Sequence, residues 1–359
     1  MIIACPKEIK ILENRVGLTP SGVFQLVSLG HKVYIQRGAG AGSGFEDQEY
    51  ILAGAGIKNT AAELYMLADI VIKVKEPLAS EYKLIRENQI IFTYFHFASS
   101  IELIQEMAAS KAICIAYETI KDKHGGLPLL VPMSQIAGRL AVLEGLRFLT
   151  KPFGGLGILP GGVPGVEPAK ITIVGAGMVG TEAAKIAAGL DAEVTILDVN
   201  PNRLLYLSET LPKNVKTIFS NASSISKYSS EADLLIGAVL VPGASAPKLV
   251  TEAMVKNMKK GAVIVDVAID QGGCIETSIK TNFDAPTFEK HGVIHYCVAN
   301  MPGAVARTAT LALTQVTLPY LIQLADKGYE KMSIEDKGFA NGVNIDKGVI
   351  LLDEIKHLV

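Results

Sequence analysis

The chain has 359 residues, with 34 lysines and arginines against 36 aspartates and glutamates and a formal net charge of −2. A balance so close to neutral disfavours nucleic acid or an anionic membrane as the main partner. A hydrophobic content of 49% over this length predicts a large core and two domains. The four cysteines lie far apart without a C-x-x-C pair, which favours a reducing, cytoplasmic compartment.

The first third of the chain alternates short apolar runs with helical patterns, as is typical of a parallel α/β sheet. The opening residues MIIACPKEIK lack a basic segment before the apolar run and predict a first strand, not a signal peptide. The expected strands are 2–4, 32–36, 70–74, 90–94 and 112–116, and the expected helices are 20–29, 46–53, 61–66, 80–85 and 99–110. The glycine-rich stretch 38–44 has the wrong spacing for a nucleotide motif and predicts a loop.

A second α/β region follows. Ser134 is expected to cap a helix over 135–149, and further strands are expected at 171–174, 215–219, 234–237, 263–267 and 293–298. His291 and His295 are four residues apart but fall on a strand pattern, so no metal site is predicted. The apolar run 308–325, interrupted by Thr, Gln and Pro, favours a buried or interface helix over a membrane span.

The expected fold is α/β, with two Rossmann-like, doubly wound parallel-sheet domains and a cleft between them. Residues 1–129 plus 306–359 are predicted to form one domain, and residues 130–305 the other. Two domains joined in this way can close on a cofactor and a substrate.

The strongest motif is the segment 171–198, ITIVGAGMVGTEAAKIAAGLDAEVTILD. Gly175 allows a tight turn after a strand, Gly177 lets the backbone approach a pyrophosphate, and Gly180 lets helix and strand pack closely. The helix that begins here directs its free N–H groups at the phosphates. Asp198 ends the next strand, where a carboxylate accepts both ribose hydroxyls and repels a 2′-phosphate. The segment therefore predicts dinucleotide binding with NAD favoured over NADP.

Four ionisable residues fall at or just past the expected strand ends, where open parallel sheets bind ligands. They are Arg15, Lys75, His96 and Asp270. Each has an ordinary alternative: a surface arginine, a solvated charge pair of Lys75 with Glu76, a half-buried histidine, and an Asx-type turn. As a set they provide a planar guanidinium that can bind both oxygens of a carboxylate, an ammonium for a carbonyl or imine oxygen, and two acid/base groups. With NAD, this set fits hydride transfer at a carbon that bears a carboxylate and an amine or hydroxyl.

Seven segments of the chain are long and unusual: KEIKILENRVGLTP (7–20), KVKEP (73–77), TYFHFA (93–98), PMSQIAGR (132–139), GGVPGVEPAKITIVGAGMVG (161–180), VDVAIDQGGC (265–274) and CVANMPGAVART (297–308). Through them nearly the whole chain resembles the L-alanine dehydrogenase family, which also includes transhydrogenase alpha-like proteins. The resemblance implies reversible oxidative deamination of L-alanine to pyruvate and ammonium, NAD as cofactor and a cytoplasmic homo-hexamer with 308–325 in subunit contacts.

The resemblance also implies residue roles. Arg15 and Lys75 would bind the substrate, and His96 and Asp270 would be the catalytic pair. The implied cofactor contacts, with the motif residues above, are Ser134, Gly175, Gly177, Met178, Val179, Gly180, Asp198, Arg203, Ser220, Val239, Leu240, Val267, Ala268, Ile269, Asp270, Val298, Ala299, Asn300 and Met301.

The chain departs from the family pattern at three places. Ile279-Lys280 stands where an arginine is common, so a cofactor contact is lost or taken over by Lys280. Gln135 replaces a frequent glutamate and Ala306 a frequent proline. Three alternatives stay open: a different 2-oxo or amino acid substrate, the soluble part of a proton-pumping transhydrogenase, and an NAD-binding scaffold without catalysis. The division of proton steps between His96 and Asp270 is also open.

Overall fold

The structure is a computed structural model that describes residues 1–239 and 246–358. The chain divides into two units: unit 1 comprises Met1–Met133 with Gly303–Val359, and unit 2 comprises Ser134–Pro302. Each unit is a mostly parallel sheet with flanking helices, so the predicted α/β class with two doubly wound sheets is confirmed.

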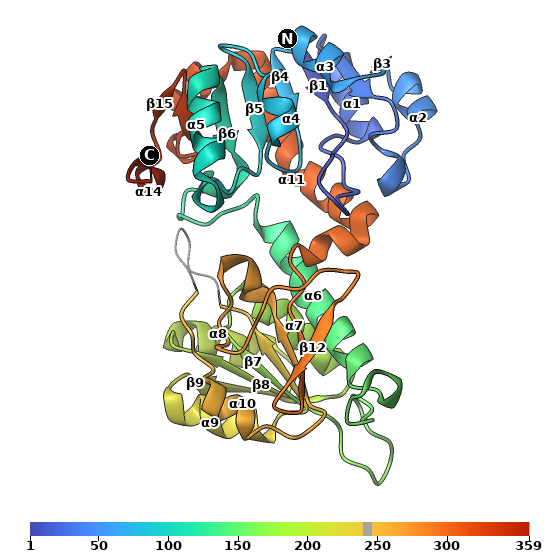
Figure 1. The fold of residues 1–359 in the computed structure, drawn as a ribbon, viewed down its shortest axis with the longest axis vertical. Coiled ribbons are helices and arrows are strands. Elements are labelled where there is room, and N and C mark those ends of the chain that lie inside the picture. Colours follow the sequence, from blue (N-terminus) through green and yellow to red (C-terminus); the bar gives the residue numbers. More distant parts are fainter. Residues whose placement is uncertain (240–245, 359) are drawn as a thin grey trace. The chain divides into compact units, whose positions relative to one another are not determined.

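Unit 1 contains an eight-stranded sheet with the order β15-β14-β6-β5-β4-β1-β2-β3 (Figure 1). The strands are β1 (Ile2–Cys5), β2 (Lys32–Gln36), β3 (Gly56–Lys58), β4 (Ile70–Ile72), β5 (Ile90–Thr93), β6 (Ile113–Ala116), β14 (Val343–Asp346) and β15 (Val349–Ile350). All pair in parallel except β14 and β15, which are antiparallel to their neighbours. The sequence analysis missed β3, β14 and β15, which are short or lie outside the alternating pattern.

The helices of unit 1 begin at side-chain caps where the sequence offers them. Thr19, Thr60 and Ser100 each accept a backbone N–H of the first helical turn. The helices are α1 (Pro20–Ser28), α2 (Asp47–Leu52), α3 (Ala61–Leu67), α4 (Ala79–Tyr82), α5 (Ile101–Ser110), α11 (Ala306–Lys327), α12 (Tyr329–Glu335), α13 (Lys337–Ala340) and α14 (Asp353–Lys356). The stretch 38–44 is the predicted loop, with one short turn of 3₁₀-helix at Ala41–Ser43.

The long helix α11 returns the chain to unit 1. Its Thr310 Oγ1 accepts the Val16 N–H at 3.1 Å and lies 2.8 Å from Ser43 Oγ. Arg307 on the same helix donates to the carbonyl of Ser43. These bonds tie the loop after β1 to a segment almost three hundred residues away, which no local pattern in the sequence indicates.

Unit 2 contains a seven-stranded sheet with the order β12-β13-β11-β10-β7-β8-β9. The strands are β7 (Lys170–Val174), β8 (Glu193–Asp198), β9 (Val215–Phe219), β10 (Leu234–Gly237), β11 (Val263–Asp266), β12 (Thr287–Lys290) and β13 (Val293–Tyr296). The helices are α6 (Val131–Phe148), α7 (Met178–Gly189), α8 (Pro201–Thr210), α9 (Ala222–Glu231) and α10 (Glu252–Lys256). The first turn of α6 belongs to unit 1. Only β12, which was not predicted, is antiparallel to its neighbour.

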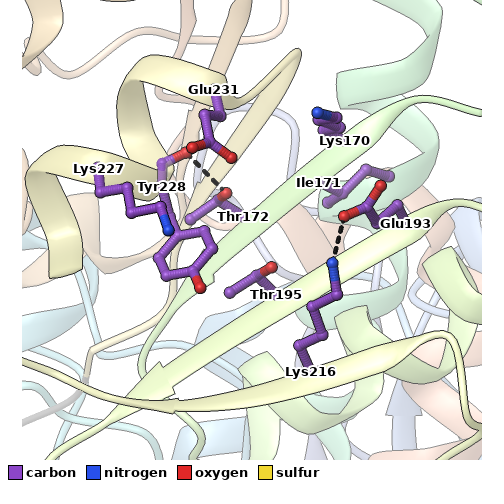
Figure 2. A pocket seen from close by; sticks show the side chains of 9 residues that line it. All are labelled: Lys170, Ile171, Thr172, Glu193, Thr195, Lys216, Lys227, Tyr228 and Glu231. Atoms are coloured by element: carbon purple, nitrogen blue, oxygen red, sulfur yellow. Dashed lines mark hydrogen bonds and ion pairs between the residues drawn. The ribbon is translucent and has the colours of Figure 1, made fainter.

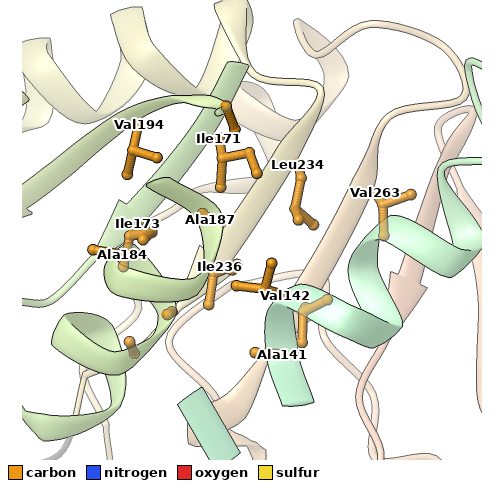
Figure 3. Close-up of a cluster of buried hydrophobic side chains, with 14 of the residues drawn as sticks. Ala141, Val142, Ile171, Ile173, Ala184, Ala187, Val194, Leu234, Ile236 and Val263 are labelled. Atoms are coloured by element: carbon orange, nitrogen blue, oxygen red, sulfur yellow. The ribbon is translucent and has the colours of Figure 1, made fainter. Parts of the chain in front are cut away.

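The core of unit 2 follows from the alternation of side chains along the strands. Ile171 and Ile173 on β7 belong to one buried cluster with Ala184 and Ala187 on α7 (Figure 3). Val174, next along β7, belongs to a separate cluster on the other face. Both faces of the sheet are therefore covered, and ligands are restricted to its edges.

One helix start was predicted wrongly. The helix α6 begins at Val131, so Ser134 lies inside the helix and does not cap it. Pro132 is the second residue of this helix, a position where the missing N–H of proline has no intrahelical partner to lose. The sequence pattern placed the start after the proline, but the fold uses the proline within the first turn.

Among the residues that the structure describes, no helix is long and apolar enough to cross a membrane.

Candidate active site

Three of the four predicted ionisable residues follow adjacent strands of unit 1. Arg15 lies in the loop after β1, Lys75 three residues past β4, and His96 three residues past β5. Because these parallel strands are neighbours, their carboxyl ends bring the three side chains to one edge of the sheet. The positive charges of Lys75 and Arg15 both act on His96, which agrees with this placement.

Arg15 is held by a residue that the sequence analysis did not single out. Its Nε and Nη2 donate to the two oxygens of Glu13 at 2.7 and 2.5 Å, and Nη1 lies 3.1 Å from the sulfur of Met133. The residue is 2% exposed. Burial by itself would lower the pKa of Arg15, but the hydrogen bonds and charge of Glu13 outweigh it and raise the pKa. Arg15 is therefore a fixed cation and not a mobile surface residue.

Lys75 is largely withdrawn from solvent and does not form the expected pair with its neighbour. Glu76 pairs instead with Lys10. The N–H groups of Val74 and Lys75 donate to Glu8 Oε1 at 2.6 and 3.3 Å, which fixes the backbone at this strand end. Burial and then the charge of Arg15 lower the pKa of the Lys75 ammonium. A half-buried ammonium near a second positive charge favours the binding of an anionic oxygen.

His96 adopts a left-handed backbone, with φ 49° and ψ 43°. Its ring stacks on Tyr94 with centroids 5.7 Å apart and planes 7° from parallel. The side chain is 45% exposed, so dehydration is incomplete. Partial burial, followed by the charges of Lys75, Lys10 and Arg15, lowers the pKa of His96 below its ordinary value. The imidazole is therefore neutral at neutral pH and can accept a proton there.

In unit 2, the glycines after β7 have the backbone geometry that the motif requires. Gly175 has φ 103°, and a Cβ there would lie 2.6 Å from the Ala238 carbonyl oxygen. A Cβ on Gly180 would lie 1.9 Å from the Gly175 carbonyl oxygen. A Cβ on Gly177 would meet nothing within 4 Å. This glycine is the N-cap of α7, and no side chain caps the helix. The helix N-terminus is thus accessible, which fits a pyrophosphate.

Asp198 ends β8 beside this turn. Its Oδ2 accepts the Ala176 N–H at 2.7 Å and its Oδ1 accepts the Asn200 N–H at 2.8 Å. Arg203 donates to the Ala176 carbonyl and to Thr181 Oγ1, both at 2.8 Å. The carboxylate and the guanidinium are therefore both anchored on the glycine turn.

The other predicted cofactor residues mostly follow carboxyl strand ends of unit 2. Ser220 follows β9, Val239 comes two residues after β10, and Leu240 lies outside the described residues. Met178 and Val179 form the first turn of α7, and Ser134 lies on α6. The remaining ones fall in the 3₁₀-helix Val267–Gln271 after β11 and in the segment after β13, namely Val267, Ala268, Ile269, Asp270, Val298, Ala299, Asn300 and Met301.

Asp270 lies on the 3₁₀-helix Val267–Gln271 and not in a simple Asx turn. Its Oδ2 accepts the Asn300 N–H at 3.1 Å, which joins the two segments that follow β11 and β13. Asp266, one residue before this 3₁₀-helix, accepts the N–H groups of Ala268, Cys274 and Ile275. The position of Asp270 is thereby fixed from both ends of its segment.

Three acidic residues were missed in the sequence: Glu8, Glu13 and Glu118. Glu118 follows β6, the strand next to β5. The criterion that identified His96, an ionisable residue just past a strand end, would therefore have identified Glu118 as well. Glu8 and Glu13 lie in KEIKILENR, on either side of a loop whose path only the tertiary structure shows.

Two surface pockets lie at the amino ends of the strands, whereas the predicted site residues follow the carboxyl ends. In unit 2, Lys170, Glu193 and Lys216 line one of them at the amino end of the strands, and Lys216 pairs with Glu193 at 2.5 Å (Figure 2). The second pocket, in unit 1, includes Asp69 and Arg86 near the amino ends of β4 and β5. Neither contains a predicted site residue. The described part of the chain holds no group of three or more His, Cys, Asp or Glu side chains able to bind a metal.

The two sheets, the glycine turn with its terminal aspartate and the cationic strand ends define a nucleotide-dependent oxidoreductase built on two Rossmann-type units. Residues 4–137 match the family alanine dehydrogenase/PNT, N-terminal domain, and residues 141–353 match alanine dehydrogenase/PNT, C-terminal domain. The chain belongs to the alanine dehydrogenase/PNT family, whose alanine dehydrogenases use NAD.

Named relatives agree with this assignment. The chain is 55% identical to an alanine dehydrogenase of Methanococcus maripaludis, over 99% of this chain and 95% of that protein, and 54% identical to alanine dehydrogenase 2 of Staphylococcus aureus, over 97% and 94%. A solved L-alanine dehydrogenase superimposes with a TM-score of 0.96 at 49% identity, covering 100% of this chain and 99% of that one. A transhydrogenase from Sinorhizobium meliloti gives 0.86 at 27% identity, covering 98% and 100%.

Proposed function

We propose that the chain is an NAD-dependent L-alanine dehydrogenase that catalyses L-alanine + NAD⁺ + H₂O ⇌ pyruvate + NH₄⁺ + NADH + H⁺. The observation that supports this most strongly is the placement of Arg15, Lys75 and His96 on adjacent strand ends of unit 1. Family membership and identities of 54–55% to alanine dehydrogenases support the same reaction.

Substrate binding is assigned to residues 1–129 with 306–359. Arg15 anchors the substrate carboxylate, and Glu13 keeps the guanidinium in one orientation. Lys75 polarises the carbonyl or imine oxygen, for which its half-buried ammonium near Arg15 is well suited. Fixed cations that meet a carboxylate and a carbonyl together select 2-oxo and 2-amino acids over simple ketones and amines.

The cofactor is assigned to residues 130–305. Gly175, Gly177 and Gly180 hold the pyrophosphate, Asp198 the adenosine ribose, and Arg203 the region of the adenosine. Further contacts come from the strand-end segments already named. Bound there, NAD⁺ would supply the hydride acceptor that oxidises the amine carbon of alanine to an iminium.

The proton steps of the reaction are assigned to His96 and Asp270. Asp270 activates the water that attacks the iminium carbon. His96, neutral at working pH, takes and returns the proton of the oxygen on the tetrahedral carbon. Loss of ammonia from this carbon gives pyruvate.

We further propose a homo-hexamer in the cytoplasm, with α11 in subunit contacts. The four cysteines are all buried and free, which suits a reducing compartment. Light scattering coupled to gel filtration measures the assembly directly, and a monomeric mass would contradict the hexamer.

The reaction is tested by the loss of NADH absorbance with pyruvate and ammonium, with pyruvate alone as the control. Ammonium-dependent turnover is the expected result. Turnover without ammonium would indicate a hydroxy-acid dehydrogenase and contradict the role of Asp270. NADH binding without turnover would favour another 2-oxo acid or a non-catalytic protein, and a panel of 2-oxo acids separates these two.

A further inference from the structure

Glu118 is a partly buried acid in unit 1 that the proposed reaction does not use. It lies on the 3₁₀-helix Tyr117–Thr119 directly after β6, which pairs in parallel with β5. Its Oε1 accepts the N–H of Phe95 at 3.0 Å and the N–H of His96 at 2.5 Å. One carboxylate oxygen thus holds two consecutive backbone N–H groups beyond the end of β5.

This contact lies at a residue with an unfavourable backbone conformation. His96 has φ 49°, a region that costs a residue with a side chain about 1–2 kcal/mol unless its surroundings hold it. Two hydrogen bonds to a carboxylate contribute a free energy of comparable size and so restrain the backbone in this conformation. Tyr94 adds a second one, because its ring stacks on the imidazole and its hydroxyl donates to the Leu129 carbonyl at 2.5 Å.

The same carboxylate oxygen also lies near the ring. His96 Nδ1 is 4.0 Å from Glu118 Oε1. A negative charge on this side favours the tautomer that carries its proton on Nδ1 and leaves Nε2 as the proton acceptor. A carboxylate that fixes both the backbone and the tautomer of a histidine is a recurrent arrangement in acid/base catalysis.

We propose that Glu118 is a positioning residue for His96, which it holds through the backbone N–H groups and orients through its negative charge beside Nδ1. This inference rests on the proposed role of His96 as the acid/base group.

The pH dependence of this role follows from the environment of Glu118. Burial raises the pKa of Glu118 to about 7, although hydrogen bonds from His96 and Phe95 and the charge of Lys75 act in the opposite direction. The carboxyl is thus charged above this pH and neutral below it. The other titratable or charged groups that face Glu118 and His96 are Tyr94 after β5, Tyr117 beside Glu118, and Lys10, Arg15 and Lys75 from the loops after β1 and β4.

Two substitutions separate the backbone role from the charge role. Glu118→Gln keeps an oxygen acceptor for the N–H groups but cannot ionise, whereas Glu118→Ala removes both. We expect kcat for reductive amination in Glu118→Gln to match the wild type at pH 6 and to fall roughly tenfold or more at pH 8.5, with little change in the KM for pyruvate. Glu118→Ala should lose kcat at both pH values. Asp69→Asn is the matched control, since Asp69 also accepts a backbone N–H, that of Ile2, but at the amino edge of the sheet.

A second measurement does not depend on turnover. Diethylpyrocarbonate acylates neutral imidazole, and peptide mass analysis follows the rate at His96 alone, which is exposed enough to react. The wild type should react faster than Glu118→Gln at pH 8.5 and at the same rate at pH 6. This difference would support the positioning role even if pyruvate and ammonium prove not to be substrates.

Two results would overturn the proposal. If Glu118→Gln follows the wild type at every pH in both kcat and acylation rate, the charge has no role. If a folded Glu118→Ala, checked by circular dichroism, keeps full kcat, the backbone restraint has none.

Discussion

The sheets of the two units share the order of five parallel strands, β5-β4-β1-β2-β3 in unit 1 and β11-β10-β7-β8-β9 in unit 2, but they differ in the side chains at their carboxyl edges. In unit 1 the neighbouring strand ends carry two cations, Arg15 and Lys75, and the imidazole of His96. In unit 2 glycines follow the central strand β7, and the aspartates beyond the neighbouring strands, Asp198 and Asp270, accept backbone N–H groups. The shared topology therefore decides only where a ligand can bind, and the side chains at the edge decide which ligand.

The largest effect is expected from removing the acid/base group of unit 1. His96→Ala should lower kcat by roughly 10²–10⁴ while NADH binding by unit 2 stays unchanged. Steady-state rates and NADH fluorescence titration measure the two quantities. His124→Ala, in an exposed turn of the same unit, is the control. Near-normal turnover in His96→Ala would remove the residue from the mechanism.

The glycine turn of unit 2 is expected to separate stability from binding. Gly180→Ala places a Cβ 1.9 Å from the Gly175 carbonyl oxygen and should destabilise the protein by roughly 2–4 kcal/mol in urea unfolding. Gly177→Ala meets nothing within 4 Å and should leave stability nearly unchanged but weaken NADH binding. Equal stability of the two variants would contradict the steric argument, and unchanged NADH affinity in Gly177→Ala would contradict the pyrophosphate site.

Replacing Asp198 should change the choice of nucleotide. Asp198→Ala removes the proposed acceptor of the ribose hydroxyls, which predicts a loss of about 1.5–3 kcal/mol in NADH binding and a smaller preference for NADH over NADPH. Titration with both nucleotides measures this. Asp284→Ala, an exposed aspartate of the same unit, should leave both affinities unchanged. An unaltered preference in Asp198→Ala would assign the discrimination elsewhere.

The smallest effect is expected from replacing a buried carboxylate that joins two helices of unit 2. Glu182 on α7 is 2% exposed and bonds Arg139 on α6 and Lys185. Burial would raise its pKa, but the bonds to Lys185 and Arg139 outweigh this and lower it. A folded-state pKa below the unfolded one stabilises the protein above the unfolded pKa, and this contribution disappears as the pH falls through the folded pKa.

Glu182→Gln should therefore cost about 1–2 kcal/mol at neutral pH and less as the pH is lowered past the ordinary range of a glutamate. Urea unfolding at several pH values measures this, with exposed Glu209→Gln as the control. A cost that does not depend on pH would show that the carboxylate acts through shape and not through charge.

Local patterns were sufficient for the strands of both sheets that follow the βα alternation and for the glycine turn. They failed at β3, β12, β14 and β15, since two- to four-residue strands are defined by their pairing partner more than by their own sequence. They also misplaced the start of α6, because Pro132 fits the first turn of a helix as well as it ends a loop. The family resemblance then supplied site residues that spacing alone does not distinguish from ordinary loop residues.

The parallel α/β class, the dinucleotide motif of 171–198 and the ionisable residues at strand ends could be read from the sequence alone, because each depends on a short periodic pattern or on a residue type at a fixed offset. The tertiary structure decided which charges meet. Glu13 holds Arg15, Glu8 holds the backbone at Lys75, and Glu118 holds His96. Apart from Glu13, these partners lie tens of residues from the groups they hold, and adjacency in a folded sheet, not spacing along the chain, brings them together.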